Sequence, residues 1–222
     1  MIKIAVVIPV LNQFKYAIDA LESIKTQNLW TPFIIPNYRA GQSVSASWNI
    51  GTRQAIFEGY THILIINDDV VIGPYTVDHL VNIMNDNPDI GVITGTDYRW
   101  SYSPDEMRGL EFPGHTDDIT NGPDFACFMI TPESYEAIGE FDEEFSPAYF
   151  EDNDYTYRAY LIDRPAVRSL NGAFYHYGSQ TQNSTGKQIV PPKQFLRNKK
   201  RYIEKWGGEP DHELFKTPFN KG

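Results

Sequence analysis

The first hundred residues alternate between short apolar runs and segments in which apolar residues recur at helical spacing, and this alternation constrains the fold most. The apolar runs predict four strands, at residues 2–8, 33–35, 62–66 and 90–94. The segments between them predict three helices, at residues 14–24, 43–57 and 73–84. Residues 2–8 are apolar on both faces, which is typical of a strand in a covered parallel sheet. Alternating strands and helices form right-handed βαβ units, so the predicted class is α/β with a Rossmann-like first half.

Three polar residues, Asn67-Asp68-Asp69, follow directly after the third predicted strand. Open parallel sheets bind ligands at the carboxyl ends of their strands, and this triplet falls at such an end. Two adjacent carboxylates repel each other unless a positive charge lies nearby, and a divalent cation bridging diphosphate oxygens supplies one. Asp and Asn are also common in turns, so a simple strand-ending turn remains the alternative.

The second half of the chain is less regular. It predicts a strand at residues 125–130, a helix from Thr131-Pro132, a helix at residues 151–161, a strand at residues 173–177 and a terminal helix at residues 193–206. Residues 97–123 are rich in proline, glycine and polar residues and predict a long loop. Residues 178–188 have no apolar pattern, and we expect them to be mobile.

Two further features of the second half carry chemistry. Glu151-Asp152-Asn153-Asp154 opens a predicted helix, where free N–H groups and the helix dipole favour acids. A cap needs one acid rather than three, and the dipole keeps a carboxylate ionised and able to accept a proton. His176 lies in an aromatic strand, where it is either structural or a ligand for a metal such as manganese.

Composition excludes several classes of function. The net charge of −10 and the pI near 4.9 argue against a nucleic-acid partner, which usually meets a basic surface. Cys127 is the one cysteine, so no intrachain disulfide can form. The apolar N-terminus extends over only about nine residues, whereas a bilayer span requires about 20. It also lacks the basic region of a signal peptide. We therefore expect a cytoplasmic, soluble protein with no transmembrane segment and no signal peptide.

Seven segments of the chain look like the motifs of one enzyme family. They are Val7–Asn12, Glu22–Gln27, Ser45–Gly51, Leu64–Asp69, Asn121–Phe125, Ile138–Phe145 and Tyr149–Asp154, the last followed by Arg158. The order and spacing of the last two segments and Arg158 are the most specific part of the match. Together the seven segments resemble family 2 of the inverting glycosyltransferases, which have the GT-A fold. Asn67 stands in the first acidic place of that family's aspartate (DXD) motif. The step between Gln27 and Asn37 is shortened, and Asn37 stands where the family has a base-reading acid.

The resemblance implies a metal-dependent transfer of a sugar from a nucleotide diphosphate donor, with UDP as the default, to a hydroxyl of a glycan or other acceptor. It implies a hexosyltransferase in which Asp152 is the base, Glu151 supports it, and Asp69 with His176 holds Mn²⁺ or Mg²⁺. The residues expected to contact the donor are Pro9, Val10, Asn12, Asn37, Asn49, Asn67, Asp68, Gly122 and Lys187. Residues 178–190, which include Lys187, are expected to form a lid over the donor.

The expected organisation is a single GT-A catalytic domain over residues 1–185. Within it, residues 1–96 form the nucleotide-binding half and residues 97–185 the acceptor half. Residues 186–222 form a helical extension packed on that domain. Two alternatives remain, an inactive nucleotide-sugar-binding or lectin-like module and a nucleotidyltransferase. The turn after the first strand, Pro9-Val10-Leu11-Asn12-Gln13, lacks the glycine-rich basic loop typical of the latter.

Overall fold

The computed structural model describes residues 1–10, 14–36, 42–116, 118–178 and 192–221. The strands are β1 (Lys3–Val10), β2 (Leu29–Pro36), β3 (His62–Ile66), β4 (Val70–Ile72), β5 (Val92–Asp97), β6 (Ile119–Thr120), β7 (Cys127–Ile130) and β8 (Ala166–His176). The helices are α1 (Phe14–Ser23), α2 (Val44–Phe57), α3 (Thr76–Asp86), α4 (Pro104–Arg108), α5 (Pro132–Ile138), α6 (Glu151–Leu161) and α8 (Pro192–Trp206). A short 3₁₀ turn, Pro218–Asn220, follows α8.

All eight strands belong to one sheet. Its order is β2-β1-β3-β7-β5-β8-β4, and β6 pairs with β8. The pairings make β2, β1, β3, β5 and β8 run in one direction, while β7, β4 and β6 run against them. The expected class, a mostly parallel α/β sheet flanked by helices with a shorter antiparallel part, is thereby confirmed. The antiparallel β7 lies between β3 and β5, so these two parallel strands are not neighbours.

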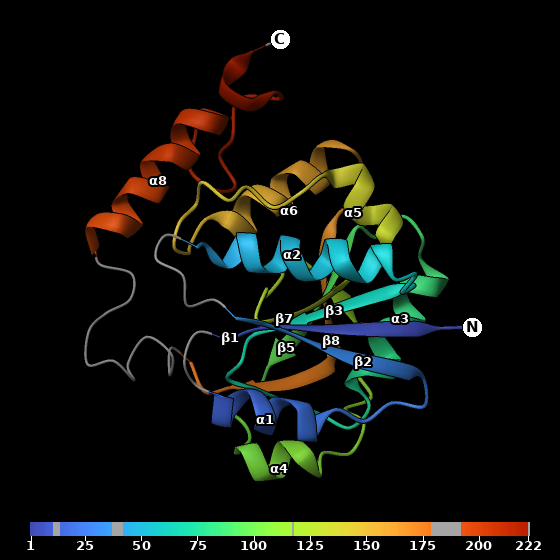
Figure 1. Cartoon of the computed structure of the whole chain (residues 1–222). Coiled ribbons are helices and arrows are strands. Elements are labelled where there is room, and N and C mark those ends of the chain that lie inside the picture. The colour runs from blue at the N-terminus through green and yellow to red at the C-terminus, as the bar shows by residue number, and fades with distance from the viewer. Residues whose placement is uncertain (11–13, 37–41, 117, 179–191, 222) are drawn as a thin grey trace.

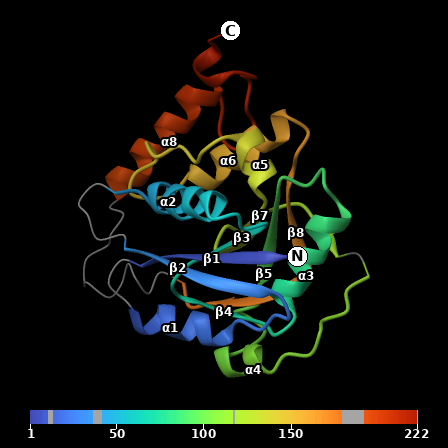
Figure 2. The ribbon, with the colours of Figure 1, turned by 45° about the vertical axis from the view of Figure 1, so that its right-hand side comes forward.

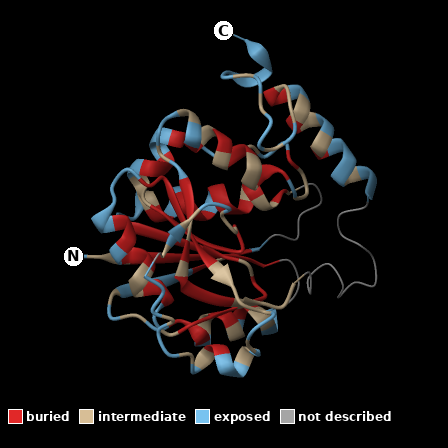
Figure 3. Ribbon diagram, turned by 180° about the vertical axis from the view of Figure 1, so that it is seen from behind, coloured by how far each residue is buried: buried red, intermediate tan, exposed pale blue. Residues whose placement is uncertain are grey.

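Alternate side chains of β1 enter two separate cores, because successive side chains of a strand point to opposite faces. Ile4, Val6 and Ile8 pack with α1 and α3 on one face. Ala5 and Val7 pack with α2, α5 and α6 on the other. Figure 1 shows α2, α5 and α6 on one side of the sheet and α1 with α4 on the opposite side. Strands β1, β3, β4 and β7 are almost continuously buried, whereas the edge strand β2 is largely exposed. Figure 3 shows the buried strands between the helices.

Local signals place most helix ends as the sequence predicts. The hydroxyl of Ser43 accepts the N–H of Ala46 and caps α2, and the Thr131 hydroxyl caps α5 with Pro132 in its first turn. Helix α6 covers residues 151–161, as predicted. The apolar residues at helical spacing within residues 14–24 do not all face the core, because Phe14 and Ile18 are 58% and 55% exposed. Ala17 and Ala20 face the core there instead.

The second half holds more regular structure than expected. Strand β8 begins at Ala166 rather than at residue 173, and the segment predicted as a loop contains α4 and β6. Helix α8 lies against α6 through a third apolar cluster. Figures 1 and 2 show the two helices beside each other. This cluster consists of Phe145, Phe150, Tyr157, Tyr202 and Trp206. Within the described residues, no helix combines the length and the apolar character that crossing a membrane requires.

Candidate active site at the carboxyl edge of the sheet

Asp69 and His176 are brought together at the carboxyl edge of the sheet. Asp69 follows β3 and immediately precedes β4, and His176 is the last residue of β8. Val70 pairs with His176 in the β4–β8 ladder, so the side chain of Asp69 lies beside the imidazole. The Nε2 atom of His176 is 3.0 Å from Oδ1 of Asp69, and the N–H of Tyr177 donates to the backbone carbonyl of Asp69. Asp69 is only 4% exposed.

Two residues that the sequence interpretation missed complete this corner. Asp97 ends β5, and its Oδ1 accepts the backbone N–H of His176 at 3.2 Å and that of Arg99 at 2.9 Å. The Arg99 side chain is paired with Asp97 through Nε, and its Nη2 lies 3.1 Å from Nδ1 of His176. Had the fourth predicted strand been extended beyond Thr94, the same edge rule would have identified Asp97.

The position of Arg99 fixes the tautomer of His176. A guanidinium only donates hydrogen bonds, so Nδ1 of the imidazole must accept here and carries no proton. The proton of a neutral His176 is then on Nε2 and points at Asp69. A cation bound by Nε2 needs that lone pair free, so it competes with the arrangement that Arg99 holds.

The Asp69–His176 pair fits part of a divalent-cation site. Neighbouring ligand atoms of an octahedral ion bound at about 2.1 Å are about 3.0 Å apart, which is the separation of Oδ1 and Nε2. Across the described part of the chain, no three or more His, Cys, Asp or Glu side chains gather closely enough to hold an ion. The pair therefore suits an ion that takes its remaining ligands from a bound phosphate group and water.

The carboxylates of Glu151 and Asp152 lie at the same edge of the sheet, at the start of α6. Helix α2 begins at this edge because it follows β2, and its Val44 N–H donates to the carbonyl of Pro147 at 2.9 Å. The loop that enters α6 is thereby fixed at the carboxyl edge. Glu151 is 7% exposed, and its Oε2 atom has no hydrogen-bond partner among the described residues.

Burial shifts both carboxyl groups. It raises the pKa of Glu151 well above its ordinary value, and the neighbouring charge of Asp152 raises it further. Burial also raises the pKa of Asp152, although backbone N–H groups, that of Asn153 foremost, lower it in part. The charge of Asp124, which lies before β7 at this edge, adds to the rise. The rise in pKa is larger for Glu151, so Asp152 is the stronger candidate for a carboxylate.

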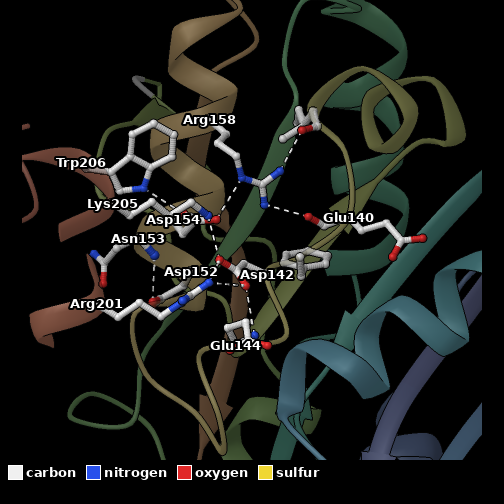
Figure 4. A network of polar contacts seen from close by, with 12 residues as sticks. Glu140, Asp142, Glu144, Asp152, Asn153, Asp154, Arg158, Arg201, Lys205 and Trp206 are labelled. Carbon is white, nitrogen blue, oxygen red and sulfur yellow. Dashed lines mark hydrogen bonds and ion pairs between the residues drawn. The ribbon is translucent and has the colours of Figure 1, made fainter. Parts of the chain in front are cut away.

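Asp154, the third acid of the motif, faces away from this site and joins α6 to α8 (Figure 4). It is fully buried and accepts hydrogen bonds from Nε of Arg158 at 2.9 Å and Nε1 of Trp206 at 2.8 Å. The Nζ atom of Lys205 lies 2.6 Å from its Oδ1. Phe150 is the N-cap residue and makes no side-chain cap bond. Of the three acids, Asp154 is therefore structural, whereas Glu151 and Asp152 lie at the carboxyl edge.

Most of the residues expected to contact a donor are described by the structure, and three of them are not. Pro9 and Val10 end β1 at the carboxyl edge, and Asp68 is buried next to Asp69. Asn67 donates its backbone N–H to the carbonyl of Ala126, and Gly122 has a φ of 82°. Asn12, Asn37, Lys187 and the expected lid, apart from Gly178, lie outside the described residues.

Asn49 lies apart from the acidic edge. Its side chain is fully buried, and its Nδ2 donates to the carbonyl of Phe141 and to Oε1 of Glu143. Its Oδ1 accepts from the hydroxyl of Tyr135 and the N–H of Phe141. The amide is thus fully used in joining α2 to α5 and the segment after it.

Comparison with known proteins identifies the architecture. No protein-family model matches the sequence, and no curated protein matches it. Solved structures match the fold: residues 1–349 of S. aureus TarS align with a TM-score of 0.59 at 13% identity, and GalNAc-T7 with UDP, GalNAc and Mn²⁺ aligns at 0.63 and 14%. The catalytic domain of Drosophila β1,4-galactosyltransferase 7, in complex with xylobiose, aligns at 0.59 and 12%. The chain has the GT-A fold.

The extent of these matches differs between the chains. The alignments cover 92% of this chain and 64% of the TarS chain, 93% and 49% for GalNAc-T7, and 96% and 82% for the Drosophila enzyme. This chain therefore spans less than two thirds of the TarS chain and about half of the GalNAc-T7 chain. At such identities the likeness establishes the GT-A fold and leaves the chemistry to the site.

Proposed function

We propose that this protein is an inverting, metal-dependent glycosyltransferase of the family 2 type. It transfers a hexose from a nucleotide diphosphate sugar, with UDP as the default nucleotide, to an acceptor hydroxyl. The observation that carries the proposal is the placement of the Asp69–His176 pair and the Glu151–Asp152 pair at one carboxyl edge of the sheet. One pair suits a diphosphate-bound cation, and the other supplies a proton acceptor.

Inversion needs a single displacement with no covalent enzyme intermediate. The acceptor oxygen forms a bond to the anomeric carbon as the bond to the diphosphate oxygen breaks, and the acceptor proton passes to Asp152. The raised pKa of Asp152 makes it a stronger base than an exposed aspartate. Burial favours the neutral form of Glu151, which keeps a second negative charge away from the base.

The opposite end of the site holds the leaving group. Asp69 and His176 would hold Mn²⁺ or Mg²⁺, which when bound neutralises the charge that develops on the leaving diphosphate. Asn67 and Asp68 lie beside this pair in the chain, and we assign them to contacts with the ribose or the phosphates. The GalNAc-T7 structure contains UDP and Mn²⁺, which supports this assignment of ligands.

Asp152→Asn tests the proposal directly. The variant retains the shape and hydrogen-bonding capacity of the side chain but cannot accept a proton. Base catalysis supplies about 10²–10⁴-fold in rate, so transfer from a panel of nucleotide sugars should fall by that factor. Calorimetric affinity for the nucleoside diphosphate with Mn²⁺ should stay unchanged.

If Asp152 served only as a helix cap, Asn would replace it without loss, because both residues cap well. A transfer rate in Asp152→Asn within about threefold of wild type, well below the base-catalysis range, would therefore refute the base. Binding of nucleotide sugars with no turnover by the wild-type protein would instead identify an inactive binding module.

A further inference from the structure

The turn that leads into α6 has a strained backbone. Tyr149 and Phe150 both have left-handed conformations, with φ values of 79° and 75°. A left-handed conformation is sterically unfavourable for a non-glycine residue, and two bulky neighbours in sequence seldom share it. Such strain persists only where the surrounding structure enforces it, and it gathers at functional sites. Glu151 and Asp152 follow this turn directly.

Helix α8 supplies the contacts that enforce the turn. The Nδ2 atom of Asn198 donates to the carbonyls of Ala148 at 2.9 Å and Tyr149 at 3.2 Å, and Asn198 is fully buried. One helical turn earlier, Nε2 of Gln194 donates to the carbonyl of Ser146 at 2.6 Å. Two residues on one face of α8 thus bind three backbone carbonyls of the segment before α6.

Aromatic contacts from the same face of α8 fix the side chains of the turn. The Phe195 ring lies 5.5 Å from that of Tyr149 and 5.2 Å from that of Phe150, between ring centres. Tyr202 packs against Phe150 at 5.8 Å. Beyond the turn, Lys205 and Trp206 bind Asp154 in the first turn of α6 (Figure 4). Helix α8 therefore contacts the start of α6 both before and after Glu151 and Asp152.

We propose that α8 is a positioning element for the catalytic carboxylate, and that Asn198 is its key residue because it holds the 149–150 turn in the strained form that aims Asp152. This inference rests on the proposed function of Asp152 and adds a role for the C-terminal helix. Released from Asn198, the turn would relax to right-handed or extended backbone and rotate the start of α6. Misplacement of a reacting group by about 1 Å can cost about a hundredfold in rate.

The turn also contributes its own N–H groups to the carboxyls. The N–H of Tyr149 lowers the pKa of Glu151, and that of Phe150 lowers the pKa of Asp152. Asp152 also faces the charge of Asp124, which raises its pKa. Loss of the strained turn removes the stabilising N–H groups and leaves the acid neighbours, so the pKa of Asp152 should rise further. A packing defect elsewhere in α8 would not move this pKa.

The experiment compares Asn198→Ala with Lys200→Ala, because the Lys200 side chain is 77% exposed on α8 and forms an ion pair with Glu204 on the same helix. In Asn198→Ala we expect kcat to fall about ten- to hundredfold with donor KM and Mn²⁺ affinity unchanged. The acid limb of its kcat/KM profile should move to higher pH. Wild-type kcat and an unmoved acid limb in Asn198→Ala would overturn the inference.

A double variant separates strain from simple loss of stability. Glycine adopts the left-handed conformation freely, so Tyr149→Gly should restore part of the lost rate in the Asn198→Ala background, by at most about tenfold. If Asn198 only stabilises the fold, Tyr149→Gly should instead lower activity in both backgrounds. This second outcome would also overturn the inference.

Hydrogen exchange provides a readout that does not depend on activity. In Asn198→Ala, amides 149–154 should exchange about tenfold faster or more, while amides of β1 and β3 keep wild-type protection. Equal exchange of amides 149–154 in Asn198→Ala and Lys200→Ala would refute the role of Asn198 in holding the turn. If the wild-type protein transferred no sugar but the exchange pattern were as expected, the proposed function would be refuted. The role of Asn198 in holding the turn would still be supported.

Discussion

The Nε2 atom of His176 and the Oδ1 atom of Asp69 lie 3.0 Å apart, although 107 residues separate them in the chain. The register of a three-residue strand creates this contact, because Val70 in β4 pairs with His176 in β8. The bond is local in space and distant in sequence. The assignment of Asp69 and His176 as metal ligands and the role given to Arg99 both depend on this contact.

Removal of the cation or of its carboxylate ligand should abolish turnover. EDTA should stop transfer, and Mn²⁺ should restore it. Asp69→Asn retains an oxygen for His176 but lacks the charge, so its affinity for Mn²⁺ should fall by more than the about 10–100-fold that loss of an outer-shell partner causes. Calorimetry and the electron paramagnetic resonance of Mn²⁺ measure this. Full turnover in EDTA would contradict the assignment.

Arg99→Gln should bind Mn²⁺ more tightly than the wild-type protein. The variant removes a positive charge near the site, and its shorter side chain no longer brings a donor to Nδ1 of His176 to keep the proton on Nε2. A hydrogen bond to a charged group contributes about 1.5–3 kcal/mol, so the gain should approach or exceed about tenfold in affinity. Arg164→Gln is the control, since Arg164 pairs with Glu133 and precedes β8 at the opposite end of that strand. Equal affinities in the two variants would refute the role of Arg99.

Local sequence signals predict most of the described helices. Helix α6 covers the predicted residues 151–161, which open with the acidic run Glu151-Asp152-Asn153-Asp154. The position of β7 between β3 and β5 could not be predicted, because strand order depends on long-range pairing rather than on periodicity. Strand β4 has three residues directly after an acidic turn, too few to show a pattern.

The exposed apolar residues of α1 show the same limit. Helical spacing includes Phe14 and Ile18 in the stripe, but the small side chains of Ala17 and Ala20 let the helix approach the sheet on a neighbouring face. The role of Asp154 was also hidden, because its partners on α8 lie about 50 residues away in the chain. Residues whose partners are distant in sequence are those that pattern alone could not assign.

Glu151→Gln should stabilise the protein at neutral pH. Burial raises the pKa of Glu151, so its folded form favours the proton and the native state loses stability as pH rises through that raised pKa. The glutamine variant has no such loss. Its advantage in the free energy of unfolding should be absent below about pH 4 and should grow above it. A gain of about 1 kcal/mol raises the melting temperature by about 2–4 °C in a chain of this size. An advantage that is the same at all pH values would contradict a raised pKa of Glu151 in the folded state.

Lys205→Met should destabilise the fold and show the opposite pH dependence. Lys205 is 6% exposed, and its Nζ lies 2.8 Å from Asp142 and 2.6 Å from Asp154. Removing one partner of a buried ion pair costs about 3–5 kcal/mol, and the low end applies because Asp154 retains Arg158 and Asp142 retains Arg201.

The pH dependence of this loss identifies its origin. Burial would raise the pKa of Asp142, but the hydrogen bond and charge of Lys205 lower it below its ordinary value. The stability that this pairing contributes is present above the unfolded-state pKa of about 4 and is lost as pH falls through the folded value. The difference between wild type and Lys205→Met should therefore narrow below about pH 4. Urea unfolding at pH 7 and at pH 3 measures it, with Lys200→Ala as the exposed control expected to stay within about 0.5 kcal/mol of wild type. A difference that persists undiminished at pH 3 would show that Lys205 stabilises α8 by packing rather than by charge.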